Sequence, residues 1–119
     1  MLKTLTLPLD KVLFKPPPLH TVLYLSGLPQ GGINILDKSP YGNHGTITGA
    51  TWVRLPSGLW GLSFDGDDYV TVTSSASLTI TTGSFTYLAW VKASSQTDAI
   101  GRLIIKRTGA TNWYSLGVL

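Results

Sequence analysis

Short stretches of apolar and β-branched residues recur along this chain at spacings of about ten residues, separated by clusters of Gly, Pro, Asp, Ser or Thr. This spacing fits short strands joined by tight turns and is too short for long helices. From His20 onward the stretches are HTVLYLSG, GTITGATWV, LWGLSF, YVTVTS, SLTIT, SFTYLAWVKA, GRLIIKR and NWYSLGVL. The pattern predicts about nine strands, no helix, and an all-β fold built as an antiparallel β-sandwich or jelly roll.

The composition supports the same fold class. All six acidic residues are aspartates, and the chain has no glutamate, which is a helix-favouring residue. The chain is 43% hydrophobic and only 13% charged, so it should fold rather than stay disordered. Its 119 residues predict one domain.

Several classes of protein are excluded by what the chain lacks. Because it contains no cysteine, it has no disulfide framework, thiolate zinc site or cysteine nucleophile. The nine basic residues are scattered, and only Lys106 and Arg107 are adjacent, which argues against nucleic-acid binding. No apolar run approaches the ~20 residues of a membrane-spanning helix. Pro8 and Asp10 interrupt the first residues, so no signal peptide is expected and the localisation stays open.

The first nineteen residues differ from the rest of the chain. The stretch MLKTLTLPLDKVLFKPPPL alternates leucine with polar residues around Pro8 and ends in the three prolines of residues 16–18. A proline run favours an extended polyproline conformation. The sequence therefore predicts an extended, Pro-rich N-terminal arm over residues 1–19. A poorly ordered terminus and an arm that docks on a neighbouring subunit both fit this pattern.

Alternation along two of the predicted strands indicates which side chains face the core. In YVTVTS, Val70 and Val72 share one face, and Tyr69 and Thr71 share the other. In SFTYLAWVKA the same reading predicts that Trp90 is buried. Both stretches are typical of half-buried strands in a sandwich.

Three phrases resemble, in the same order, the laminin-G-like and concanavalin A-like jelly-roll modules. They are LDKSPYGNHGTITGATW (36–52), LSFDGDDYVTV (62–72) and GSFTYLAWVKA (83–93), and the final NWYSLGVL is similar to a later strand of such modules. Pro40 and Tyr41 stand where the family usually has a glycine. The resemblance implies a laminin-G-like β-sandwich domain over residues 20–119 that stops before the family's last strands.

A sandwich without its closing strands would expose backbone edges and an apolar face. The resemblance therefore implies either that the chain is a truncated gene product or that the sheet is completed by the arm, by a second copy in a homo-oligomer, or by another chain. The leucine-bearing residues 1–15 are the candidate for strand addition at such an edge.

The acidic turn of residues 65–68 is the most prominent polar cluster. Asp65, Asp67 and Asp68 could bring several carboxylate oxygens around Ca²⁺, and family modules often bind calcium. Asp and Gly are also the residues that tight turns favour, and no glutamate is near. The structural role is the preferred interpretation, and calcium stays an alternative.

A second set of candidate residues lies in the predicted loop before the second stretch. Asp37 and Asn43 could be ligand contacts or hydrogen bonders that organise the loop, and the latter is preferred. Tyr41 and Trp113 lie in loops or near strand starts, so their rings could stack on a sugar. His44 is expected to be structural. The predicted ligand-binding residues are Asp37, Tyr41, Asn43, Asp67, Asp68 and Trp113.

No catalytic constellation is found in the sequence. Glycoside hydrolases of the concanavalin A-like fold carry paired glutamates on one strand, whereas this chain has none. Asp67 and Asp68 would point to opposite faces of a strand. We therefore expect a non-catalytic, lectin-like binding module for glycans or protein surfaces. The alternative is a structural or decoration subunit of a virion or cell-surface layer, and the family resemblance favours such extracellular or virion locations.

Overall fold

The computed structural model describes residues 20–29, 31–93, 101–108 and 112–118 of the 119-residue chain. The chain divides into two compact units, Met1–Thr81 and Thr82–Leu119. The described elements are antiparallel strands and one 3₁₀ helix, with no α-helix among these residues. The all-β prediction is confirmed at this level, and the jelly-roll sandwich stays a prediction.

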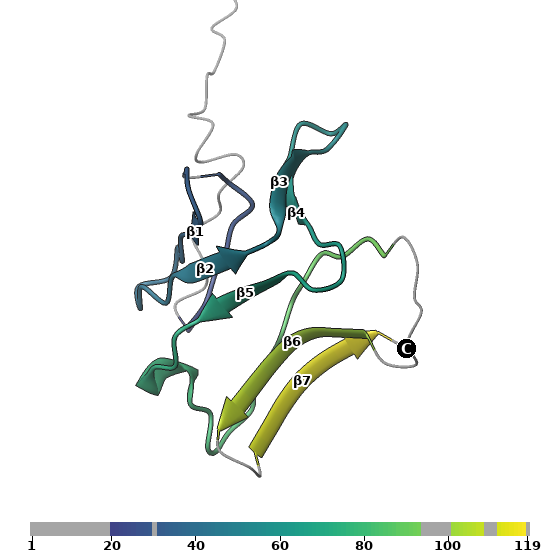
Figure 1. The fold of residues 1–119 in the computed structure, drawn as a ribbon. Helices are drawn as coiled ribbons and strands as arrows, with labels where there is room; N and C mark the ends of the chain where they lie inside the picture. The colour runs from purple at the N-terminus through teal and green to yellow at the C-terminus, as the bar shows by residue number, and fades with distance from the viewer. Residues whose placement is uncertain (1–19, 30, 94–100, 109–111, 119) are drawn as a thin grey trace, which may run out of the picture. The chain divides into compact units, whose positions relative to one another are not determined.

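A three-stranded antiparallel sheet forms the centre of the first unit, in the order β1–β2–β5 (Figure 1). Its strands are β1 (Asn34–Ile35), β2 (Gly45–Thr48) and β5 (Tyr69–Val72). Ile47 lies opposite Val70, and Gly45 lies opposite Val72. An isolated bridge between Leu25 and Asp37 adds a further contact on the chain segment that follows β1.

One face of this sheet carries the core of the first unit. Ile35 and Ile47 are the two buried hydrophobic residues of the described chain, with 5% and 7% of their surfaces exposed. Gly45 lies opposite Ile35 on β1, and a Cβ at this position would come within 2.7 Å of Ile35 Cγ2 and of Val70 Cγ1. The glycine therefore allows close packing on this face. Val70 is half-buried and Tyr69 is exposed, which confirms the predicted alternation.

A hairpin follows β2, formed by β3 (Thr51–Arg54) and β4 (Trp60–Ser63). Gly49, with φ of +79°, lies in the turn between β2 and β3. Across the hairpin, Trp52 pairs with Leu62 and Arg54 pairs with Trp60. The Arg54 guanidinium lies 5.9 Å from the centre of the Trp60 ring, within the range of a cation–π contact.

The predicted strand SLTIT, residues 77–81, does not form. Its first two residues belong to a short 3₁₀ helix, η1 (Ala76–Leu78), and the remaining three form no strand. The amides of Leu78 and Thr79 donate to the carbonyl oxygens of Ser75 and Ala76, each at 3.1 Å. Ser75 and Ser77 also direct their hydroxyls into a polar cluster described below. These local hydrogen bonds compete with strand pairing, so the β-like sequence does not form a strand here.

The second unit contains the hairpin of β6 (Gly101–Thr108) and β7 (Asn112–Val118), with an irregularity between Arg102 and Ile104. Both were predicted as strands. The described residues 82–93 form no strand, which makes the SFTYLAWVKA prediction wrong over that stretch. Trp90 is 95% exposed, contrary to the predicted burial. Alternation identifies which side chains share a face, but burial also requires a second layer against that face.

None of the described helices is long and apolar enough to cross a membrane, which is consistent with the prediction of no membrane span. The predicted arm, residues 1–19, lies outside the described residues.

Candidate functional site

The loop between β1 and β2 is organised around the carboxylate of Asp37, which is only 6% exposed. Oδ1 accepts hydrogen bonds from the amides of Tyr24 (2.7 Å) and Ser39 (2.9 Å). Oδ2 accepts from the Ser39 hydroxyl (2.5 Å) and from the amide of Asn43 (2.8 Å). Each oxygen therefore has two donors, and both are occupied by the protein itself.

These bonds determine the charge state of the loop. Burial acts to raise the pKa of the Asp37 carboxyl, but the hydrogen bonds from the Ser39 hydroxyl and from the amides of Tyr24, Ser39 and Asn43 outweigh burial and hold it below its ordinary value. Asp37 is thus ionised at neutral pH, with its charge compensated by the surrounding N–H and O–H dipoles.

Asn43 connects the same loop to two other segments of the chain. Its Nδ2 donates to the carbonyl oxygen of Val22 (2.7 Å) and to the Ser77 hydroxyl (2.9 Å). Its Oδ1 accepts from the Ser75 hydroxyl (2.7 Å), which also lies 2.9 Å from the Ser77 hydroxyl. Through this one buried amide, the loop is connected to the segment before β1 and to the start of η1.

The hydrogen bonds of Asp37 and Asn43 are of the loop-organising kind that the sequence favoured. The polar atoms of both side chains are occupied by protein partners, so the two residues stabilise the loop. The contribution of Ser39, Ser75 and Ser77 was not foreseen. The Asp37-Lys38-Ser39 spacing could have indicated the first, because Asp side chains accept bonds from amides two residues later.

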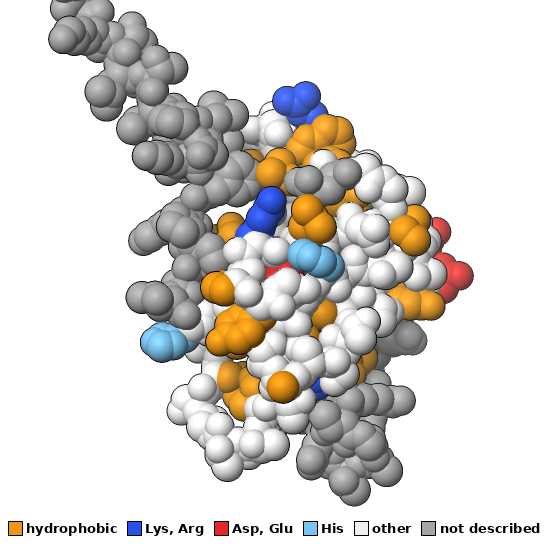
Figure 2. Space-filling model, turned by 90° about the vertical axis from the view of Figure 1, so that its left-hand side faces the viewer, with side chains coloured by type: hydrophobic (Ala, Val, Ile, Leu, Met, Phe, Trp, Pro, Cys, Tyr) orange, Lys and Arg blue, Asp and Glu red, His pale blue; other side chains and the backbone are white. Residues whose placement is uncertain are grey.

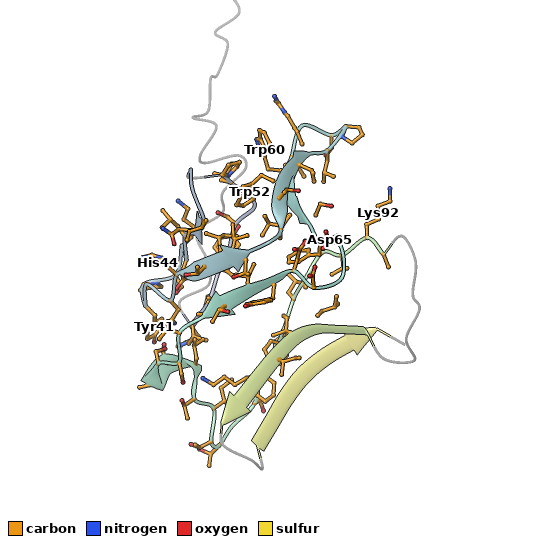
Figure 3. All side chains as sticks on the ribbon, in the orientation of Figure 1. Tyr41, His44, Trp52, Trp60, Asp65 and Lys92 are labelled. Atoms are coloured by element: carbon orange, nitrogen blue, oxygen red, sulfur yellow. The ribbon has the colours of Figure 1, made fainter. Side chains whose placement is uncertain are left out.

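The buried polar residues hold an exposed tip. Tyr41 is 53% exposed, and its amide donates to the Ser39 hydroxyl at 3.3 Å. Gly42 follows with φ of +64°, a left-handed conformation that turns the chain back toward β2. The exposed His44 accepts a hydrogen bond from the Asp37 amide at Nδ1 (3.0 Å). Figure 3 shows Tyr41 and His44 together on one side of the first unit, away from the tryptophans of the β3–β4 hairpin.

The surface on this side of the molecule is mostly uncharged. In Figure 2, hydrophobic side chains are scattered among uncharged polar surface, and few acidic or basic side chains are seen. A surface of this kind suits a ligand that offers hydroxyl groups and apolar patches better than it suits a strongly charged one.

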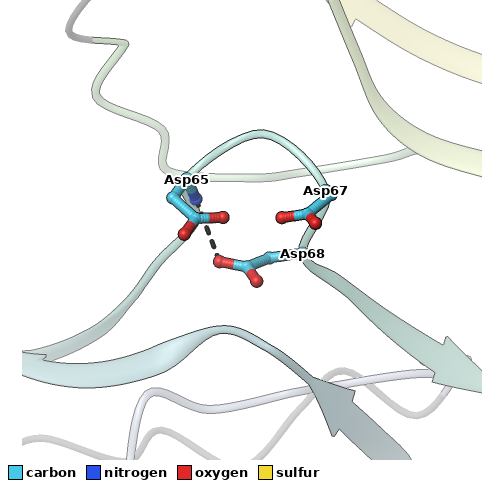
Figure 4. A group of neighbouring side chains, drawn as sticks. All are labelled: Asp65, Asp67 and Asp68. Atoms are coloured by element: carbon cyan, nitrogen blue, oxygen red, sulfur yellow. Dashed lines mark hydrogen bonds between the residues drawn. The ribbon is translucent and has the colours of Figure 1, made fainter.

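The acidic turn between β4 and β5 brings three carboxylates together (Figure 4). Ligand oxygens of Asp65, Asp67 and Asp68 all lie within 4.8 Å of one another. The Asp65 amide donates to Asp68 Oδ2 at 2.9 Å, and Gly66 has φ of +127°. The hydrogen bond with Asp67 and the negative charge of Asp68 raise the pKa of the Asp65 carboxyl above its ordinary value.

Two roles fit this turn. Three carboxylates could supply part of the six to eight oxygens that Ca²⁺ requires. The turn also has a structural contact of its own, because the Asp68 side chain lies directly against Gly49 in the β2–β3 turn and leaves no space for a Cβ there. The Asp65–Asp68 bond and the Gly49 contact support the preferred structural interpretation, while calcium binding stays a prediction.

The predicted ligand-binding residues do not form one site. Asp37, Tyr41 and Asn43 belong to the β1–β2 loop, whereas Asp67 and Asp68 belong to the β4–β5 turn. Figure 3 shows Tyr41 and Asp65 at well-separated positions on the first unit. The side chain of Trp113 lies outside the described part of the structure, so its predicted role is untested.

The β3–β4 hairpin contains two tryptophans that the sequence analysis did not identify as neighbours. Trp52 and Trp60 come from adjacent strands of the hairpin, and both are half-buried. The Trp52 Nε1 atom is buried and has no hydrogen-bond partner among the described residues. Their burial indicates a packing role for most of this aromatic surface.

Comparisons of the chain with protein-family models, with curated proteins and with solved structures found no match.

Proposed function

We propose that this protein is a non-catalytic binding module of the laminin-G-like type, and that the β1–β2 loop around Tyr41 is its contact surface. The observation that supports this function is the contrast between the buried base of the loop and its exposed tip. The Asp37 carboxylate accepts four hydrogen bonds beneath the loop, while half of the Tyr41 surface is open to solvent.

A loop held in this way loses little conformational entropy when a ligand binds, because its backbone is already ordered. An exposed tyrosine can pack its ring on the apolar face of a sugar or of a protein side chain, and its hydroxyl can bond to a polar group. The uncharged surroundings favour a neutral glycan over a strongly charged polymer.

The described carboxylates give no support to catalysis. Asp37 is the buried acid among the described residues, and its oxygens are already hydrogen-bonded. Asp65 and Asp67, which do come together, lie exposed on a turn, whereas catalytic carboxylates are expected in a concave pocket.

A glycan array probed with the full chain tests this function, followed by titration calorimetry with the best-bound oligosaccharide. Tyr41→Ala should weaken binding at least tenfold, because it removes the stacking ring and leaves the loop's hydrogen bonds in place. Tyr69→Ala is the matched control, since Tyr69 is 54% exposed on β5, outside the loop. Equal effects of the two substitutions, or no binding to any arrayed glycan, would contradict a glycan-binding loop.

A second function, a structural subunit of a larger assembly such as a virion or cell-surface layer, is favoured by a different observation. Among the described residues, β5 pairs only with β2, so its other edge carries unpaired backbone groups. An open edge of this kind is a site for strand addition. Light scattering should then give an oligomeric mass for the full chain, and a monomer at all concentrations would exclude this role.

A further inference from the structure

The outer edge of β5 lacks the features by which proteins protect exposed strands. Such edges usually carry a lysine, a proline or a bulge that prevents pairing with another strand. The four residues of β5 are Tyr69, Val70, Thr71 and Val72, which are uncharged and favour strands, and their pairing with β2 has no register shift. This edge is therefore competent to pair with a further strand.

The apolar face of the sheet also continues to this edge, and no further described strand is paired with β5 there. Val70 and Val72 share the face of the buried Ile35 and Ile47, yet both are only half-buried. A neighbouring strand with apolar side chains on the same face would cover them. The added strand should therefore have a period of two, with large apolar residues at alternate positions.

Residues 4–9, Thr-Leu-Thr-Leu-Pro-Leu, have this pattern. Leu5, Leu7 and Leu9 would lie on one face of a strand, and Thr4 and Thr6 on the other. The proline at position 8 is informative as well. It has no N–H, so in a sheet it must point its nitrogen away from the neighbouring strand, which is possible only in an edge strand.

The position of Pro8 also determines which backbone groups would bond to β5. Alternate residues of a strand direct their N–H and C=O groups to opposite edges. If Pro8 points away from β5, then Leu5, Leu7 and Leu9 point their backbone groups toward it. The same three leucines that would cover Val70 and Val72 are therefore the residues with the donors needed for pairing.

The assembly role proposed above requires the acceptor of the arm to be a second copy. Residues 10–19 link the leucine segment to His20, and fully extended they would span about 33 Å. Three of them are the consecutive prolines of residues 16–18, which favour a straight segment over a reversal of the chain. The chain then enters the first unit at Val22, whose carbonyl oxygen shares the Asn43 amide with Ser77, and at Tyr24 and Leu25, which contact residues 37 and 38 after β1. Pairing of the arm with β5 of its own chain is therefore one of the outcomes that the test distinguishes.

We propose that residues 4–9 of one copy add as an edge strand to β5 of a second copy, with Leu5, Leu7 and Leu9 covering Val70 and Val72. This inference rests on the assembly role proposed above and names its contact. The proposed contact does not involve the loop around Tyr41, so glycan binding and the addition of residues 4–9 to β5 are independent properties.

The test compares full-length variants by light scattering and by amide hydrogen exchange of β5. Leu7→Asp places a charge on the apolar face of the arm and should raise the dissociation constant of the oligomer at least tenfold, with faster exchange in residues 69–72. Thr6→Asp is the matched control: it adds the same charge on the opposite face and should change the constant by less than about threefold.

A second pair of variants examines the backbone. Leu5→Pro removes an N–H that should bond to β5, so it should weaken the oligomer. Thr4→Pro removes one that should point away, so it should have little effect. The order of these two effects follows from strand pairing and would not follow from a loose hydrophobic contact.

Each other outcome overturns the inference in a recognisable way. An oligomer that is equally stable in Leu7→Asp and Thr6→Asp would leave the assembly role standing but exclude the arm as its contact. A monomer with slowly exchanging β5 amides that become fast in Leu7→Asp would show that the arm pairs with its own chain. A monomer with fast exchange at β5 in the unsubstituted chain would exclude both the arm contact and the assembly role.

Discussion

Replacement of Asp37 by asparagine tests whether the hydrogen bonds beneath the β1–β2 loop stabilise the first unit. Asparagine has nearly the same shape but only one acceptor oxygen. If its amide nitrogen takes the place of Oδ2, it faces the Ser39 hydroxyl and the amide of Asn43, both of which are donors. Both donors therefore lose their hydrogen bond to the carboxylate. The Ser39 hydroxyl can turn to accept from the new nitrogen, whereas the buried amide of Asn43 is left facing another donor.

The size of the effect follows from those contacts. A buried donor that loses its partner costs about 1–3 kcal/mol, and bonds to a charged acceptor lie in the upper part of the usual range. Asp37 is 6% exposed, so water can replace few of the lost bonds. With two donors affected, we expect Asp37→Asn to lower the free energy of unfolding by about 2–4 kcal/mol.

Urea denaturation followed by tryptophan fluorescence measures this difference, since Trp52 and Trp60 both lie in the first unit. With an m value of about 2 kcal/mol/M, the midpoint should fall by about 1–2 M. Asp67→Asn makes the same chemical change at an exposed position and should stay within about 0.5 kcal/mol of the unsubstituted protein. A midpoint for Asp37→Asn equal to that of the control would refute the stabilising role of the carboxylate.

Two further predictions concern the same unit. Because the folded-state pKa of Asp37 is lowered, its contribution to stability should be complete above the unfolded value of about 3.9 and should be lost as the pH falls through the lower folded value. Stability measured against pH should show this loss in the unsubstituted protein, and a curve with the same acid slope in Asp37→Asn would contradict it. Gly45→Ala should destabilise by about 1–3 kcal/mol, because the added Cβ would lie 2.7 Å from Ile35 Cγ2 and Val70 Cγ1. Gly61→Ala in β4 is its control in thermal unfolding, since a Cβ there meets nothing within 4 Å, and equal losses would count against the packing explanation.

Strand positions were the most predictable part of this fold. YVTVTS and GTITGATWV combine β-branched residues with glycine or serine turns. The first stretch forms β5, and the second contains both β2 and β3. Here the local preference and the tertiary contacts agree, because the alternating valines meet a buried face. SLTIT and SFTYLAWVKA have similar preferences but form no strands in the described structure. In the first, hydroxyl groups of Ser75 and Ser77 bond to Asn43, a contact that comes from residues more than thirty positions away.

The sequence predicted which residues belong to the candidate site, but it did not predict the position of each side chain in the loop. The sequence indicated Asp37, Asn43 and Tyr41 together because they share one polar loop. It could not show that the first two lie beneath the loop and the third at its surface, since this depends on hydrogen-bond partners from residues 22–24 and 75–77. The acidic turn, in contrast, involves neighbours in sequence, so the closeness of Asp65, Asp67 and Asp68 could be predicted directly.

The sequence by itself determined the all-β class and the alternation of Val70 and Val72 with Tyr69, because both depend on residues that are neighbours along the chain. The tertiary structure alone decided that the polar atoms of Asp37 and Asn43 are hydrogen-bonded within the protein, that Tyr41 is exposed, and that β5 pairs with β2 and with no other described strand. Those properties depend on which distant segments meet, and the free energy of such contacts is not encoded in any local pattern.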